Sequence, residues 1–113
     1  MKVINTTRNT ILACNCSIAH SFWARFKGLQ LKRSLPQGSG LLITPCNSIH
    51  MFFMRFPIDA VFIDKDQVVL FIEENIKPWR ISKMVRKSKE VLELPAGTSA
   101  AAGAKPGDRL QYI

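Results

Sequence analysis

Apolar residues crowd the middle of the chain, between Ser48 and Ile72. From Ile49 to Phe56 the side chains divide at period two into two sets, and both sets are largely apolar. An extended segment of this kind needs protein on both faces, as in a barrel wall or in a sheet between two layers. The pattern therefore predicts a doubly covered strand over 49–56. We expect it to end near Pro57, because proline lacks a backbone donor.

Shorter runs predict the rest of a mainly β (α+β), small barrel-like domain with one or two short helices. Two β-branched runs, 58–63 and 68–72, flank a polar turn at 64–67 and indicate a hairpin. A helix over 22–27 capped by Ser21 and a helical turn over 98–102 capped by Thr98 complete the pattern. Further strands are expected at 2–5 and 11–16, which form a first hairpin, and at 41–43, 90–94 and 109–113. A buried helix over 51–54 is the alternative for the central run, and Pro57 disfavours it.

With 113 residues, the chain is expected to be a single domain, 1–113, with a core that needs no disulfide. No apolar run approaches the roughly 18 residues of a membrane span. Polar residues at 5–10 occupy the place of a signal peptide's apolar centre, and the cysteine count of three is odd. These features predict a cytoplasmic protein without a membrane span.

The net charge of +8 is large for this length and raises the expectation of an anionic partner such as nucleic acid. A well-solvated basic surface is the favoured explanation, because no recognised nucleic-acid motif accompanies the charge. The basic residues concentrate after Pro78, where one aromatic residue could stack on a base. The candidate patch for an anionic partner is Lys77, Trp79, Arg80, Lys83, Arg86 and Lys87.

Cys46 and His50 suggest a thiolate with a nearby base, and together with Cys14 and Cys16 they have the composition of a zinc site. On one strand, however, Cys46 and His50 would lie about 13 Å apart. The Cys-x-Cys spacing is also shorter than that of usual zinc sites. We therefore favour small buried side chains over ligands, and expect no catalytic residue, no metal and no cofactor.

Charged residues within otherwise apolar strands must be paired, solvated or functional. Arg55 could form a bidentate pair with Asp59 or Glu93 and so join two strands. If a ligand pocket exists instead, we expect it where these groups converge among apolar side chains. The candidate pocket residues are His50, Phe52, Met54, Arg55, Asp59 and Glu93.

Six short sequence blocks follow one another between about Phe22 and Leu110. They are 26–29 (FKGL), 35–36 (LP), 40–42 (GLL), 54–64 (MRFPIDAVFID), 91–97 (VLELPAG) and 107–110 (GDRL). In this order they resemble the DUF192 family of small bacterial and archaeal proteins, many of which have a Trp-Met pair where this chain has Phe53-Met54. The resemblance implies a compact, mainly β fold of barrel-like character and implies no activity.

Gly107-Asp108 before the last apolar run also resembles the Gly-Asp box of cradle-loop β-barrels, which include swapped-hairpin DNA-binding regulators. Three functions therefore remain open. The leading one is a non-enzymatic module that binds a small ligand or a protein partner. The second is nucleic-acid binding, and the third is a thiol- or zinc-dependent enzyme.

Overall fold

The computed structural model describes residues 1–21, 24–25, 29–30 and 32–113. Within these residues the chain is mainly β, with one short helix, as predicted. The predicted helix over 22–27 falls largely outside the described residues, although Ser21 Oγ accepts a hydrogen bond from Ala24 N at 3.1 Å. The elements are β1 (Val3–Asn5), β2 (Thr10–Ala13), β3 (Asn15–Ala19), β4 (Ser39–Ile43), β5 (Ile58–Ile63), β6 (Val69–Ile76), β7 (Glu90–Pro95), α2 (Thr98–Ala101) and β8 (Leu110–Tyr112).

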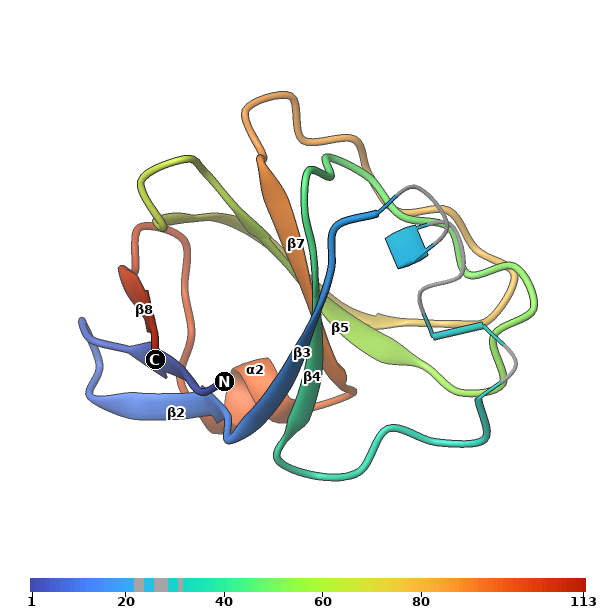
Figure 1. Cartoon of the computed structure of the whole chain (residues 1–113), viewed down its shortest axis with the longest axis horizontal. Coiled ribbons are helices and arrows are strands. Elements are labelled where there is room, and N and C mark those ends of the chain that lie inside the picture. Colours follow the sequence, from blue (N-terminus) through green and yellow to red (C-terminus); the bar gives the residue numbers. More distant parts are fainter. Residues whose placement is uncertain (22–23, 26–28, 31) are drawn as a thin grey trace.

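A five-stranded sheet in the order β3-β4-β7-β5-β6 runs through the middle of the molecule (Figure 1). The predicted hairpin is its β5–β6 pair, and Asp64 Oδ1 closes the turn by accepting hydrogen bonds from Asp66 N and Val68 N. The central strand β7 pairs antiparallel with both β4 and β5. Every residue of β5 is buried, so β5 has the cover on both faces that was predicted for 49–56.

The first predicted hairpin is confirmed for β1 and β2, which pair antiparallel. Its second arm was expected to extend to Cys16, but the chain bends at Cys14 and Asn15 begins β3. β3 then pairs parallel with β4, from Asn15 opposite Ser39 to Ala19 opposite Ile43. The chain thus leaves the small sheet after β2 and joins the five-stranded sheet as β3. Two backbone hydrogen bonds, from Cys14 N and Asn15 N to Gly38 O, hold the bend against the turn before β4.

A second, three-stranded sheet in the order β2-β1-β8 lies with α2 against one face of the five-stranded sheet, on the left of Figure 1. Thr98 was expected to cap α2, but the N-cap is Gly97, whose φ of 92° suits glycine. The capping oxygen comes instead from Asp59 on β5, whose Oδ2 accepts bonds from Gly97 N, Ser99 N and Ser99 Oγ. The two sheets do not close into one barrel. The prediction of a small, mainly β domain is therefore confirmed, whereas its barrel-like character is not.

The opposite face of the five-stranded sheet is covered by loops, mainly 44–57 and 77–89, on the right of Figure 1. The two faces therefore bury two apolar clusters. Leu12, Val61 and Leu92 belong to the cluster beneath the small sheet. Met51, Phe62 and Val91 belong to the cluster beneath the loops.

The prediction of a strand over 49–56 is wrong. The segment is a loop in which Ile49, Met51 and Met54 are buried, whereas Phe52 and Phe53 turn outward. Its backbone forms hydrogen bonds with the 77–89 loop rather than with a strand of the sheet. The segment therefore covers the sheet and is not one of its strands. Among the described residues, no helix is long and apolar enough to cross a membrane.

Candidate binding surface

Two loops far apart in sequence are joined backbone to backbone at one end of the molecule. Met51 N donates to Arg80 O at 2.7 Å, and Trp79 N donates to Met51 O at 2.7 Å. Ile49 N donates to Ser82 Oγ at 2.8 Å, and Ser82 N returns a bond to Ile49 O at 2.9 Å. Because these bonds lie on both sides of the single β-bridge between His50 and Ile81, the two loops hold each other in one arrangement.

Aromatic rings gather where the loops meet. The centroid of the Trp79 ring lies 5.0 Å from that of Phe53 and 6.0 Å from that of Phe52, which itself lies 4.9 Å from the His50 ring. Trp79 is 59% exposed and Phe53 is 55% exposed. Large rings usually supply buried contact area. Here they contact one another while remaining open to water.

The backbone of both outward-facing rings is strained. Phe53 has a φ of 62° and Trp79 a φ of 69°, in the left-handed region that a bulky side chain rarely adopts. This conformation costs a residue with a Cβ roughly 1–2 kcal/mol, and such strain concentrates at binding and catalytic sites. The structure therefore holds two exposed aromatic side chains outward at a cost in stability.

Apolar and basic side chains extend this cluster. Ile81 and Met84 are 66% and 63% exposed. Six of the exposed cations on the same two loops are Arg55, Lys77, Arg80, Lys83, Arg86 and Lys87. The ion pair between Arg8 and Asp108 is the one pair in the described part of the chain, so none of the six cations is neutralised by a described carboxylate. We define the aromatic–basic surface as Phe52, Phe53, Trp79, Ile81, Met84, Arg55, Lys77, Arg80, Lys83, Arg86 and Lys87.

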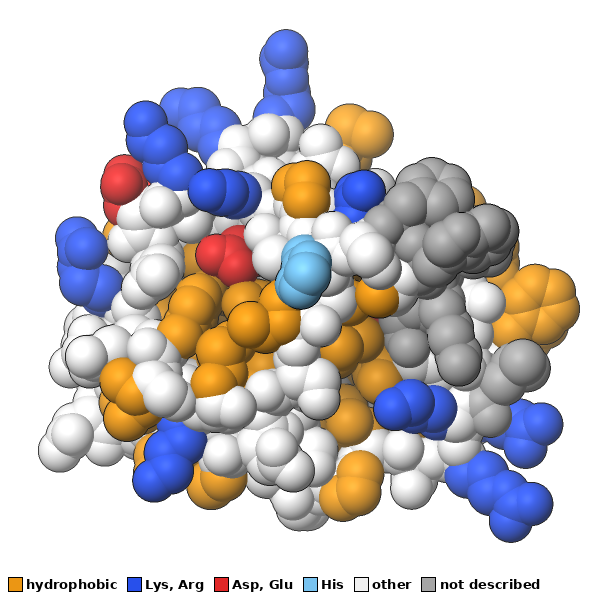
Figure 2. Space-filling view, in the orientation of Figure 1, with side chains coloured by type: hydrophobic (Ala, Val, Ile, Leu, Met, Phe, Trp, Pro, Cys, Tyr) orange, Lys and Arg blue, Asp and Glu red, His pale blue; other side chains and the backbone are white. Residues whose placement is uncertain are grey.

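Figure 2 shows the charge around this surface in the orientation of Figure 1. Basic side chains greatly outnumber acidic ones on this face. Hydrophobic side chains protrude at the right-hand margin, the side on which the two loops lie in Figure 1. The proposed patch for an anionic partner and the exposed rings belong to the same two loops. Phe53, Ile81 and Met84 were not predicted as surface residues of a site. The alternating pattern places Phe53 in a covered strand, and Ile81 and Met84 lie in a polar segment typical of a solvated loop.

The six predicted pocket residues are not brought together. Asp59 pairs with Leu94 and the next residue, Ala60, pairs with Glu93, so the two carboxylates point to opposite faces of the sheet. Met54 is buried in the core, and Arg55 is exposed and forms an ion pair with neither carboxylate. His50 and Phe52 lie in the aromatic cluster at the loop junction.

Glu93 is the unusual carboxyl group of the loop-covered face. It is 3% exposed, and its Oε1 has no hydrogen-bond partner among the described residues. Burial raises the pKa of Glu93 to about 8, because the charged form loses its hydration. The side chain is therefore mostly protonated at pH 7, and it presents little negative charge to the surrounding loops.

The three cysteines differ in burial: Cys16 is buried and Cys46 half-buried, whereas Cys14 is exposed, so the expectation of buried side chains is wrong for Cys14. Burial, together with the nearby Glu93 carboxyl, raises the pKa of Cys46, whose Sγ donates to Ser48 O at 3.0 Å. Burial also raises the pKa of Cys16 to about 11. Both thiols are therefore protonated at neutral pH and are poor nucleophiles and poor metal ligands. No three His, Cys, Asp or Glu side chains of the described residues are grouped as a metal site.

Asp108, in the Gly-Asp box, has a structural role. Burial by itself raises its pKa, but hydrogen bonds from Asn5, Arg8 and Lys105 N outweigh burial and lower it. The carboxylate thereby joins the β1–β2 turn to the turn before β8. The box belongs to the small sheet rather than to the aromatic–basic surface.

Relatives of the chain span nearly its whole length. A UPF0127 protein of Thermococcus sibiricus is 31% identical over 114 residues, which cover 97% of this chain and 73% of the relative. The UPF0127 protein PF1050 of Pyrococcus furiosus is 29% identical over 115 residues, covering 97% of both chains.

Two solved structures share the fold. A protein of unknown function from Novosphingobium aromaticivorans superposes with a TM-score of 0.85 at 24% identity, covering 98% of this chain and 82% of that one. A Sinorhizobium meliloti protein called a "putative transcription regulator" superposes with a TM-score of 0.84 at 28% identity, covering 97% and 89%. The sequence pattern of the uncharacterised family DUF192 matches residues 3–112. The chain therefore belongs to the DUF192 family.

Proposed function

We propose that this protein is a non-enzymatic module that binds single-stranded nucleic acid on the aromatic–basic surface. The observation that carries the proposal is the cluster of exposed rings, Phe52, Phe53 and Trp79, with unpaired cations on the same two loops. Proteins that bind single strands combine the same two components: aromatic side chains for the bases and cations for the phosphates.

Stacking favours a single strand over a duplex. Each base that stacks on an aromatic ring contributes about 1–3 kcal/mol, and every base has a face that can stack. In a duplex those faces are already stacked on neighbouring bases, so a protein must unstack them first. The strained backbones of Phe53 and Trp79 support this function, because they hold the rings outward before any ligand arrives.

The charge of the chain and one relative also support the proposal. The net charge of +8 favours association with a polyanion at low salt. The Sinorhizobium protein carries a regulatory description, which for that protein is consistent with a nucleic-acid partner. Cytoplasmic location stays a prediction, and nucleic acid is found in that compartment.

Fluorescence anisotropy with labelled 12-nucleotide dT and rU strands tests the proposal. We expect binding that weakens steeply as salt rises, and weaker binding of a duplex of equal length. Trp79→Ala should weaken binding by roughly tenfold, since loss of one stacked base costs about 1–3 kcal/mol. The matched control is Ile11→Ala, which removes an exposed apolar side chain from β2 in the small sheet.

The proposal fails if neither strand binds at low salt, or if Trp79→Ala binds as tightly as the unaltered chain. Vesicles with and without anionic lipid provide a second arm, because exposed rings beside cations also suit a membrane surface. Retention on anionic vesicles without binding to either oligonucleotide would replace nucleic acid by lipid as the partner.

A further inference from the structure

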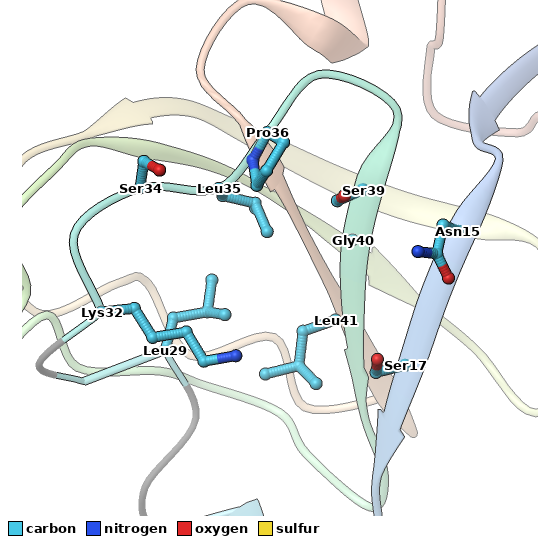
Figure 3. A pocket seen from close by; sticks show the side chains of 10 residues that line it. All are labelled: Asn15, Ser17, Leu29, Lys32, Ser34, Leu35, Pro36, Ser39, Gly40 and Leu41. Atoms are coloured by element: carbon cyan, nitrogen blue, oxygen red, sulfur yellow. The ribbon is translucent and has the colours of Figure 1, made fainter.

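A cavity of about 160 Å³ lies at the edge of the five-stranded sheet, away from the residues that define the aromatic–basic surface. One wall is formed by β3 and β4, and the other by Leu29, Lys32 and the segment 34–36 (Figure 3). The parallel pairing of Asn15 with Ser39 and of Ser17 with Leu41 places these four side chains on one face. The cavity therefore depends on the parallel β3–β4 pair.

The lining is apolar on the inside and polar at the rim. Leu29 and Leu41 are buried members of the core cluster, and Leu35 packs against it. Asn15 and Ser17 on β3 are exposed, so their polar groups lie at the open side. The cavity therefore offers a small ligand both apolar contacts and polar groups, the two components of a small-molecule site.

Lys32 supplies the only charge among the described lining residues. Figure 3 shows its side chain extending from the loop toward Leu41 on β4, across the space between the two walls. The hydroxyls of Ser34 and Ser39 line the same cavity, and each can donate one hydrogen bond. A negatively charged group at the rim would therefore meet a cation and hydroxyl donors.

From this geometry we infer that the cavity binds a small organic carboxylate with a short apolar body. The apolar part would contact Leu29, Leu35 and Leu41, and the carboxylate would be held by Lys32. An engineered apolar cavity of about 150 Å³ binds benzene, so ligands of roughly six to ten non-hydrogen atoms are the appropriate size. Inorganic phosphate would leave the apolar base without a contact.

Titration of the full chain followed by ¹H–¹⁵N NMR tests this site, with benzoate and isovalerate as probes. We expect saturable shifts at the amides of Ser17, Ser34 and Ser39, and a dissociation constant on the order of 1 mM. Benzamide, which is neutral and of the same shape as benzoate, should bind about tenfold more weakly.

Lys32→Met retains most of the apolar stem of the side chain and removes the charge. It should lower benzoate affinity about tenfold and leave benzamide affinity unchanged. Lys105→Met, in the turn before β8, removes an exposed lysine remote from the cavity and should change neither affinity. Ser17→Leu adds bulk at the exposed rim without altering the core, and should block both probes.

The inference is overturned if neither carboxylate gives saturable shifts at these amides, or if benzamide binds as tightly as benzoate. Equal benzoate affinity in the unaltered chain and Lys32→Met would also overturn it. Because the probes carry no nucleobase and the cavity shares no residue with the aromatic–basic surface, this result is independent of oligonucleotide binding.

Discussion

The two faces of the five-stranded sheet are covered in different ways. On one face, β1, β2, β8 and α2 form a regular second layer. On the other face the cover is made of loops, with two strained aromatic residues held in water. Regular elements satisfy their own backbone and need only pack, whereas loops can hold side chains at the surface in fixed directions. The small sheet thus has the features of a stabilising layer, and the loop-covered face has those required by the proposed nucleic-acid surface.

Two buried carboxyl groups on neighbouring strands show the same contrast. Asp59 faces the small sheet and α2, and its oxygens accept four hydrogen bonds, including one from Asn75 N at 2.9 Å. Glu93 faces the loops, and its Oε1 has no partner among the described residues. A buried charge without a partner destabilises a fold strongly, and protonation removes that charge but leaves the unpaired polar atom buried. The hydrogen bonds of Asp59 therefore stabilise the fold, whereas the unpaired Glu93 carboxyl group lowers its stability.

The largest expected effect is the pH dependence caused by Glu93. Its pKa is 4.5 as an ordinary side chain and about 8 in the folded protein. The unfolded chain therefore releases its proton first as pH rises, so stability is full below about pH 4.5, falls between pH 4.5 and 8, and does not recover above that. The shift corresponds to a loss of at most roughly 5 kcal/mol.

Glu93→Gln should remove this loss, so urea denaturation should show the variant to be more stable than the unaltered chain at pH 9 and similar at pH 4. Glu74→Gln is the matched control, because Glu74 is exposed near the end of β6. Equal pH profiles for the unaltered chain and Glu93→Gln would show that Glu93 is hydrated or paired in solution.

Asp59→Ala should destabilise the protein by about 3 kcal/mol, because it leaves several buried donors without an acceptor. The loss should appear as a lower midpoint in urea denaturation and as faster amide exchange at Gly97 and Ser99. Asp66→Ala, in the exposed β5–β6 turn, is expected to change stability by about 0.5 kcal/mol or less. An unchanged free energy of unfolding in Asp59→Ala would contradict the structural role given to this face.

Sequence pattern predicts the regular face better than the loop-covered one. The β5–β6 hairpin was predictable because β-branched runs flank a turn that Asp64 closes with its own side chain. The 49–56 loop was not predictable. Its buried residues, Ile49, Met51 and Met54, share the local pattern of a strand, but its partner lies about 30 residues further along the chain.

The candidate site was predictable only in part, for the same reason. The basic run around Trp79 is visible in the sequence, whereas the contact of Trp79 with Phe53 depends on the pairing of two distant loops. The cavity beside Lys32 depends likewise on β3 pairing parallel with β4 across a long connection.

Glycine substitutions test whether the backbone of Trp79 is strained, and the expected changes in the free energy of unfolding are about 1 kcal/mol. Trp79→Gly should leave stability unchanged or raise it by about 1 kcal/mol, because glycine adopts the observed φ without strain. The same change should reduce oligonucleotide binding about tenfold. Ile11→Gly, at an exposed position in β2, should lower stability by about 0.5–1 kcal/mol and leave binding intact. Destabilisation by Trp79→Gly larger than that by Ile11→Gly would mean that the ring supports the fold.

Single cation substitutions give the smallest effects. Each of Lys77→Gln and Arg86→Gln should reduce the slope of log affinity against log salt by about one, if that residue contacts a phosphate. Lys2→Gln, next to the small sheet, should leave the slope unchanged. If all three variants keep the slope of the unaltered chain, the nucleic-acid contacts lie elsewhere.

Mapping a dT 12-mer onto the full chain by ¹H–¹⁵N NMR at low salt tests whether the loop-covered face binds a single strand. We expect the largest shifts at residues 50–55 and 77–87, with little change in β1, β2 and β8. Shifts confined to the small sheet, or no shifts at any concentration of the strand, would contradict it.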